Sequence, residues 1–402
     1  MVAKRIVMLG MAILILSLAA CGPQEPSTIV ITLPPPAATA TRPGPAATVV
    51  PSPIPPSPIP PTATLAEGSG GGGVDFFVML VDYRPDPPQM IVVDPATGET
   101  QSTFDVPGLA PLSTMKIGGP FAFYLDPTTQ IVNQIGFDGN VTEMRFITSD
   151  TDYFQGDFLP SPDGTLIAWG TSTFDPGGGN ANRLTLKIAN FFAEDEKMIV
   201  DQTLPDVSIL PQPIQWSLDG RFLYYTNEPY GIGGYILFSG GPDLQRVDVA
   251  TGQVTQILPD MGCLCAMAVS PDGKTVAYIA GSGPLEFVLH DIESGEERKT
   301  LIDPGHLQAG SVLWSPDGAS LIYAMAISDF EHPEAEKYAL VRVEAATLDQ
   351  TILIPDDERL FNPMLWPTAS ALWLNDKDGN AWRLNPESGE LVLAAEGKWV
   401  VK

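Results

Sequence analysis

The chain has 402 residues, 44% of them hydrophobic, which is enough for a large buried core. Its net charge is −27 at pH 7, because 48 acidic residues outnumber 21 Lys and Arg, and such a surface repels nucleic acid and anionic lipid. Three Cys residues are too few for a disulfide scaffold, so packing and sheet hydrogen bonds must hold the fold.

The N-terminus is typical of an export signal. Two basic residues precede an apolar run, residues 6–18, that is shorter than a membrane-spanning helix requires. The run ends Leu-Ala-Ala-Cys21, which resembles the bacterial lipobox, where small residues precede a Cys that receives the lipid. The resemblance implies a signal peptide, residues 1–20, and a lipid on Cys21. The anchor is then an outer membrane or the outer face of a single cell membrane, and the sequence leaves this choice open.

Residues 21–73 form the next segment, which has no periodic apolar pattern. Its Pro-rich run, residues 51–61, favours polyproline II, and the Gly-rich residues 68–73 favour a flexible joint. We therefore expect a lipidated, disordered tether, which reaches at most roughly 150 Å at ~3.1 Å per residue. A ligand for a Pro-binding module is the alternative interpretation of the Pro runs.

Internal repeats are the main signal in residues 74–402. A Ser-(Pro/Leu)-Asp-Gly segment occurs four times before a β-branched and aromatic strand, and its Asp residues are spaced 56, 53 and 45 apart. Pro sets φ for a type I turn, Asp bonds nearby backbone, and Gly takes the left-handed position of a hairpin. The four segments begin at Ser161, Ser217, Ser270 and Ser315.

A second repeated turn, Asp/Asn-x-x-Thr/Ser-Gly, is predicted to join the outer two strands of each unit. It occurs at residues 94–99, 248–253, 291–296 and 385–390, and Gly139 replaces it in one further unit. The two signatures predict an all-β fold, a single β-propeller of about seven four-stranded blades, with six or eight as alternatives. The blades are expected near residues 75–104, 117–147, 156–202, 213–258, 265–302, 310–354 and 362–395. A β-sandwich or β-solenoid is the other architecture considered.

Together these repeats resemble the propeller of TolB and, more broadly, the WD-repeat-like propellers that share the Ser-Pro-Asp-Gly turn. The resemblance implies the fold of residues 74–402 and says little about function, because the motif residues build turns rather than a site. The helical domain that precedes the propeller in TolB has no counterpart here, where a tether stands in its place.

Evidence for catalysis in the sequence is thin. The Gly-x-Ser-x-Gly elbow of propeller-linked hydrolases is absent, and no Gly-rich loop suits a phosphate. Cys263, Cys265 and His306 are weak candidates for a Zn or Cu site, because they precede the inner strands of neighbouring predicted blades. Oxidation of the two Cys residues, or their burial, is the alternative. Residues 376–380 resemble part of a calcium loop but are explained by a hairpin turn. We expect no cofactor and no enzyme.

Long loops on one face of the predicted propeller combine aromatic residues with acids and glycines, which suits recognition of a peptide, a cationic group or a sugar. Packing of these aromatics over the blade tops is the alternative. The candidate binding residues are Asp152, Tyr153, Phe154, Phe174, Asp175, Tyr230, Tyr235, Phe330 and His332.

The sequence therefore predicts a monomeric, membrane-anchored, extracytoplasmic lipoprotein whose propeller is a non-catalytic scaffold for an envelope protein or peptide. A glycan or small-molecule sensor, or a solute-binding protein, is the first alternative. A propeller enzyme of the quinoprotein or lactonase type is the second. Nucleic acid is not expected as a partner, given the charge.

Overall fold

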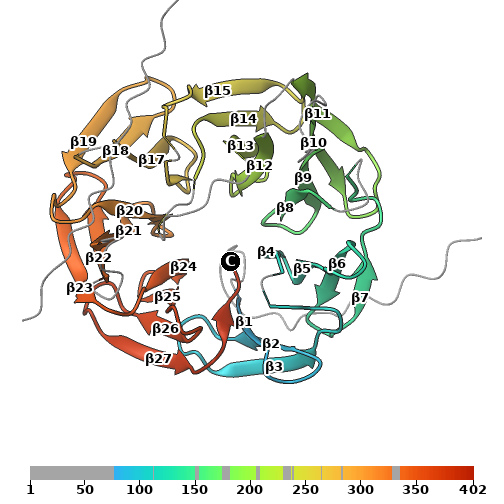
Figure 1. Cartoon of the computed structure of the whole chain (residues 1–402), viewed down its shortest axis with the longest axis horizontal. Coiled ribbons are helices and arrows are strands. Elements are labelled where there is room, and N and C mark those ends of the chain that lie inside the picture. Colours follow the sequence, from blue (N-terminus) through green and yellow to red (C-terminus); the bar gives the residue numbers. More distant parts are fainter. Residues whose placement is uncertain are drawn as a thin grey trace, which may run out of the picture. The chain divides into compact units, whose positions relative to one another are not determined.

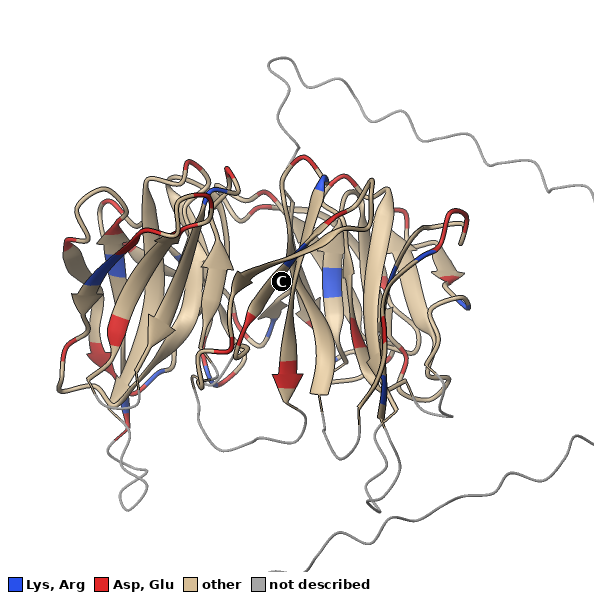
Figure 2. Cartoon of the chain, turned by 90° about the horizontal axis from the view of Figure 1, so that it is seen from above, with Lys and Arg blue, Asp and Glu red and all other residues tan. Residues whose placement is uncertain are grey.

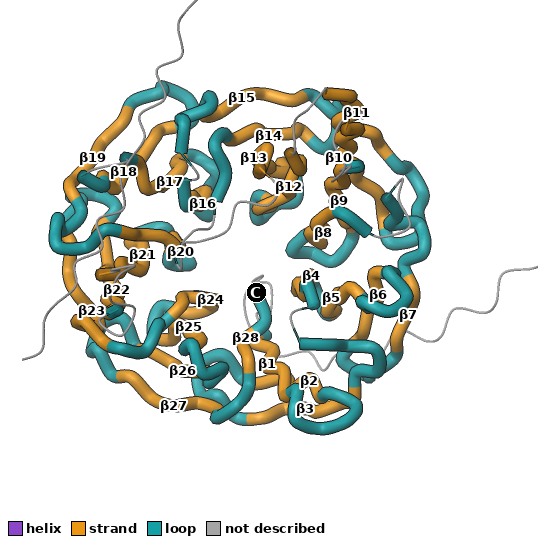
Figure 3. Tube along the Cα trace, in the orientation of Figure 1, coloured by secondary structure: helices purple, strands orange, loops and turns teal. Residues whose placement is uncertain are grey.

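The fold is a closed ring of β-sheets. The computed structural model describes residues 77–402 apart from 112, 150–153, 174–181, 205–208, 230–236, 238–239, 264, 282–283 and 328–335. Twenty-eight strands, β1–β28, form seven four-stranded sheets around a common centre (Figure 1), and strands and loops account for all described residues (Figure 3). No helix long and apolar enough to cross a membrane occurs among them. The predicted all-β propeller of seven blades is confirmed.

Each sheet is one blade, and we number the blades in chain order, from the innermost strand outward. Blade 1 comprises β28 (Trp399–Val400), β1 (Val78–Asp82), β2 (Gln89–Val93) and β3 (Thr100–Asp105). Blade 2 comprises β4 (Met115–Gly118), β5 (Phe121–Leu125), β6 (Val132–Gly136) and β7 (Val141–Glu143). Blade 3 comprises β8 (Gly156–Pro160), β9 (Leu166–Ser172), β10 (Asn182–Asn190) and β11 (Lys197–Leu204).

The remaining four blades repeat this order. Blade 4 comprises β12 (Ile209–Trp216), β13 (Phe222–Pro229), β14 (Leu244–Asp248) and β15 (Val254–Leu258), and blade 5 comprises β16 (Met267–Val269), β17 (Thr275–Ala280), β18 (Glu286–Asp291) and β19 (Glu297–Leu301). Blade 6 comprises β20 (Gln308–Trp314), β21 (Ser320–Ile327), β22 (Lys337–Glu344) and β23 (Gln350–Asp357), and blade 7 comprises β24 (Asn362–Thr368), β25 (Ala371–Asn375), β26 (Ala381–Leu384) and β27 (Leu391–Ala395).

The Ser-(Pro/Leu)-Asp-Gly segments are the hairpins between first and second strands, as predicted. Between β8 and β9, the Ser161 hydroxyl donates to Asp163 at 2.6 Å and accepts the Leu166 N–H at 2.9 Å, while Gly164 has a φ of +69°. The other three segments contain the same Ser-to-Asp bond. The second motif joins third and fourth strands: between β2 and β3, Asp94 accepts the Thr97 N–H at 2.7 Å.

Adjacent blades are joined by apolar packing and by indole hydrogen bonds. The Trp216 indole of blade 4 donates to the Leu159 carbonyl of blade 3 at 3.1 Å. The Trp314 indole of blade 6 donates to the Ala268 carbonyl of blade 5 at 3.0 Å. Both Trp residues end the innermost strand of their blade, one residue before the Ser of the turn. The repeat therefore specifies the blade and also its contact with the preceding blade.

The end of the described chain closes the ring. The sequence predicted that residues after 395 would follow the last blade, yet Trp399 and Val400 form β28, the innermost strand of blade 1. Val400 pairs with Leu80 and Trp399 with Val81, in antiparallel register. Blade 1 is thus assembled from both ends of the propeller, so ring closure depends on sheet hydrogen bonds between distant parts of the sequence.

The two faces of the ring differ. We call the face that carries both kinds of hairpin the turn face, and the opposite face the loop face. Acidic residues recur in the turns along one edge of the ring (Figure 2). The Asp residues of both motifs lie on the turn face, because they belong to the hairpins that define it. β1 begins at the turn face, because Val78 pairs with Val93, the residue that precedes the Asp94 turn. Phe77, the first described residue, therefore lies at the turn face.

Candidate functional site

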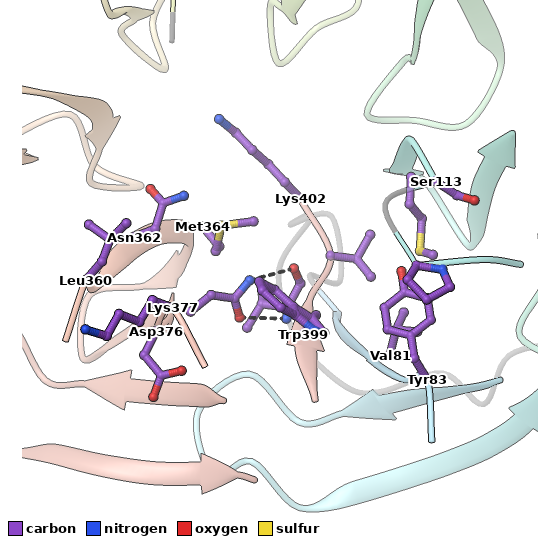
Figure 4. Close-up of a pocket in the computed structure, with 15 residues that line it drawn as sticks. Val81, Tyr83, Ser113, Leu360, Asn362, Met364, Asp376, Lys377, Trp399 and Lys402 are labelled. Carbon is purple, nitrogen blue, oxygen red and sulfur yellow. Dashed lines mark hydrogen bonds between the residues drawn. The ribbon is translucent and has the colours of Figure 1, made fainter. Parts of the chain in front are cut away.

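A cavity of about 440 Å³ opens beside the central channel where blades 7, 1 and 2 meet, and we call it the mouth cavity (Figure 4). The strand ends that form it lie toward the loop face, because β4 and β24 begin there and β1 and β25 end there. Its walls come from three blades and from the ring-closing segment: Val81, Tyr83, Pro111, Ser113, Met115, Leu360, Asn362, Met364, Asn375, Asp376, Lys377 and residues 399–402.

The walls of the mouth cavity are mainly apolar. Met364 lies on one side of the cavity and Tyr83 on the other, with Trp399 between them (Figure 4). The indole of Trp399 packs over Gly379, where a Cβ would come within 2.8 Å of its ring atoms and φ is +80°. Only glycine fits there, so Gly379 positions the indole that forms this wall.

The Asp376 carboxylate, in the cavity wall, already accepts hydrogen bonds from other groups of the protein. Asp376 accepts the backbone N–H groups of Asp378 and Asn380, each at 2.9 Å, and the side-chain N–H groups of Asn380 and Trp382 at 2.9 and 2.8 Å. These hydrogen bonds hold the pKa of Asp376 below its ordinary value, against the opposing effect of burial. They also make residues 376–380 a self-capped hairpin turn, as predicted.

Lys402 occupies the channel side of the cavity. Its side chain extends from the end of β28 toward the open centre of the ring (Figure 4). Lys402 is an exposed residue by its solvent-accessible surface, but many atoms of the ring surround its ammonium group. This desolvation, together with the charge of Lys116, lowers the pKa of Lys402 to about 8.

Charged residues of blades 2, 3 and 4 continue along the channel. Lys116 on β4 lies 4.0 Å from Asp157 on β8, and Gln212 on β12 donates to the same carboxylate at 3.0 Å. Glu228 on β13 is the next acid, and its pKa is raised by desolvation and by the charge of Asp157. The channel thus has a paired cation, Lys116, close enough to Lys402 to affect its ionisation.

A second cavity, of about 410 Å³, lies on the turn face among the hairpins of blades 5 and 6. Its cationic residue, Arg298, already donates to the carbonyls of Ala345 and Ala346, each at 2.8 Å. Its rim consists of the turns that build the blades, such as Asp272, whose carboxylate bonds Ser270. These groups are used by the fold, so the mouth cavity is the stronger candidate site.

Most of the predicted binding loops fall outside the described residues. This holds for Asp152, Tyr153, Phe174, Asp175, Tyr230, Tyr235, Phe330 and His332, and also for Cys21 and the tether. Phe154 is described: it packs against the core cluster that contains Phe158 and Trp169, and its N–H donates to Gln130 at 3.1 Å. At Phe154 the alternative interpretation, packing over a blade, therefore describes the structure.

The weak metal candidates do not form one site. Cys263 and Cys265 are joined to each other in a disulfide, which removes the two thiolates that a metal site would need. His306 is buried and lies between carboxylates, with Nε2 at 2.9 Å from Asp356 and Nδ1 at 3.5 Å from Asp303. Among the described residues, no cluster of three or more His, Cys, Asp or Glu side chains could hold a metal ion.

Sequence reasoning missed the mouth cavity. Its residues belong to no motif, and they are brought together only when β28 closes blade 1. A sequence signal did exist: residues 399–401 read Trp-Val-Val, an apolar segment of strand-forming residues after the last predicted blade. An incomplete first blade that lacks its inner strand calls for such a segment.

Comparison with known proteins finds similar solved structures but no matching family. No protein-family model matches the chain, and no curated protein matches it either. Among solved structures, the chain is similar to a hydrazine synthase of Kuenenia stuttgartiensis (18% identity, 71% of this chain and 78% of that one, TM-score 0.48). It is similar to a putative TolB of Agrobacterium tumefaciens, with 13% identity over 69% of this chain and 87% of that one and a TM-score of 0.43. It is also similar to an oligogalacturonate lyase in complex with manganese, with 14% identity over 80% of this chain and 84% of that one and a TM-score of 0.48.

These similarities correct one prediction. The sequence led us to expect that the chain is not an enzyme, but a lyase and a synthase are among the structures of similar fold. Absence of familiar motifs was therefore a poor reason to exclude catalysis, since a propeller can carry an activity that the turn motifs do not reveal. At these identities the similarity concerns the fold alone. The described chain is a β-propeller of seven four-stranded blades.

Proposed function

We propose that this chain is an exported lipoprotein, anchored through Cys21, that binds a segment of an envelope protein or peptide in its mouth cavity. The observation that supports this most is the cavity itself: about 440 Å³, mainly apolar, and open at the central channel. This volume lies within the usual range for sites that enclose a ligand or an inserted side chain, roughly 300–1,000 Å³. A small molecule is therefore the second candidate ligand.

The rim of the cavity has the residue types that anchor partners. Trp399 is 42% exposed, and next to the cavity the Arg359 guanidinium lies over the rings of Phe361 and Trp382, with ring centroids 5.0 and 5.1 Å away. Aromatic residues and Arg are enriched in the centres of protein interfaces, where they combine apolar area with directed hydrogen bonds.

Site-specific photo-crosslinking in cells that express the full chain tests this function. A photoreactive residue in place of Lys377, at the cavity rim, should give a defined crosslinked product, and the same residue in place of Glu293, on the turn face, should not. Adding Asn362→Trp, which fills the cavity, should remove the product. Equal products from both faces, or a product that survives Asn362→Trp, would contradict the proposal.

A further inference from the structure

We propose that the mouth cavity selects an apolar group that carries a carboxylate, with the carboxylate held by Lys402 and Asn362 at the channel side of the cavity. This inference rests on the proposed function, because it names the ligand chemistry of the same site. The ligand would be a small organic acid or the C-terminus of a polypeptide that ends in an apolar residue. Both present the same carboxylate chemistry.

The body of the ligand is indicated by the walls. Met115, Met364 and Tyr83 face the cavity with half-buried side chains, and the buried Val81 and Val401 form part of its base. Burial of apolar ligand area against such walls is favourable by roughly 25 cal/mol per Å² before the cost of association. Two Met side chains also let the walls adapt to an irregular or aromatic group.

The charge of the ligand is indicated by the groups that the protein leaves free. Among the described residues, no hydrogen bond or ion pair joins a protein acceptor to the ammonium of Lys402, and the side-chain amide of Asn362 has no partner. In Figure 4 both side chains extend to the channel side of the cavity. Three ammonium N–H donors and an amide donor, next to apolar walls, are complementary to the oxygens of a carboxylate.

The acidic side chains near the cavity support a carboxylate ligand, because each of them already has an Arg partner or several hydrogen bonds within the protein. Asp376 accepts four hydrogen bonds within its own turn. Asp82 and Asp357, at the neighbouring strand ends, form ion pairs with Arg84 and Arg359 at 2.6 and 2.7 Å. The side chains of these three acids are therefore engaged by the protein, although the whole chain carries a net charge of −27.

The ionisation of Lys402 agrees with this geometry. The ring and the nearby Lys116 disfavour its charged form when the site is empty, which lowers the pKa of Lys402 to about 8. A bound carboxylate would oppose both effects, since it supplies a charge of the opposite sign beside the ammonium group.

The test compares two probes of equal shape on the purified full chain, by isothermal titration calorimetry: 4-phenylbutyrate and its neutral amide, 4-phenylbutanamide. We expect the acid to bind at least about tenfold more tightly than the amide. Lys402→Met should reduce this preference to near unity while the amide binds as before. Lys398→Met, which removes the same charge from a residue outside the cavity wall, should keep the preference.

Equal affinity for acid and amide, absence of binding by either, or an unchanged preference in Lys402→Met would overturn the inference. The proposed function is judged separately, by the cavity-dependent crosslink from position 377, which involves neither probe. A pentapeptide ending in Phe, with a free or an amidated C-terminus, distinguishes the two sources. Tighter binding of the free-acid peptide than of 4-phenylbutyrate indicates a polypeptide C-terminus, and weaker binding indicates a small acid.

Discussion

The side-chain amide of Asn375 pairs with the backbone of Val400 in both directions: it accepts the N–H at 2.9 Å and donates to the carbonyl at 3.3 Å. Asn375 ends β25 of blade 7, and Val400 lies in β28, the strand that closes blade 1. The buried amide of Asn375 thus pairs with Val400 as the backbone of a neighbouring strand would, and it joins the last blade to the first. The same closure forms the mouth cavity.

Asn375→Ala should therefore weaken ring closure. It leaves the N–H and carbonyl of Val400, a residue only 3% exposed, without their partners. Unsatisfied buried groups cost about 1–3 kcal/mol each, so we expect a loss of about 2–4 kcal/mol in the free energy of unfolding, measured by urea denaturation. Asn362→Ala is the control, since it removes an amide without a partner and should change stability little. Equal effects of the two substitutions would show that the Asn375 bridge does not hold the ring.

Leu218→Pro should stabilise the propeller. Leu218 stands where the other three turns have Pro, yet its turn forms the same bonds: Ser217 donates to Asp219 at 2.6 Å and accepts the Phe222 N–H at 2.9 Å. Because Leu218 is exposed and its N–H donates no hydrogen bond in the structure, Pro removes freedom from the unfolded chain alone. We expect a gain of about 0.4–1 kcal/mol by thermal denaturation. A loss of stability would show that this turn has a different backbone conformation.

Binding of 4-phenylbutyrate should weaken as pH rises through about 8. The free-state pKa of Lys402 is about 8, and a bound carboxylate raises it, so the complex holds more protons than the free protein above that pH. Affinity is then constant from pH 6 to 7 and falls at higher pH, until the pKa of the complex is passed. Calorimetric titration at several pH values measures this dependence.

Two variants separate Lys402 from the other groups along the channel. Lys402→Met should make the affinity independent of pH above 7. Glu228→Gln should leave the fall in affinity above pH 8 in place. The pKa of Glu228 is raised, but Lys116 and Asp157 lie between this carboxyl group and Lys402. A decline that persists in Lys402→Met would show that Lys402 is not the group responsible.

Reduction of the Cys263–Cys265 disulfide should have little effect on the fold. The bridge joins residues two positions apart, so it closes a very short loop and restricts the unfolded chain by no more than about 2 kcal/mol. The loop is also held by the pairing of Cys265 with Gly241. Circular dichroism melting with and without a phosphine reductant measures the change, and loss of the folded state on reduction would refute this expectation.

Local chemistry explains how much of the fold was predictable. Ser161, Asp163 and Gly164 satisfy one another within a single turn, so their spacing reveals a hairpin wherever it occurs. Repetition of that hairpin, together with the second repeated turn, predicted the blades and their number. The pairing of Val400 with Leu80 spans nearly the whole propeller and leaves no local pattern, so the ring closure was not predicted.

The candidate site was harder to predict for the same reason. Tyr83, Met115, Met364 and Lys402 lie on four segments far apart in the sequence, and each has an ordinary role in its own strand end. What makes them a site is their convergence around the channel. The loops that did stand out by composition, such as the one with Phe174 and Asp175, lie outside the described residues.

The most direct test of this account is a crystal structure of the full chain with 4-phenylbutyrate. The account predicts the phenyl group between Met364 and Tyr83, and the carboxylate within hydrogen-bond distance of the Lys402 ammonium at the channel side. A ligand bound on the turn face, or one whose carboxylate points away from Lys402, would contradict it.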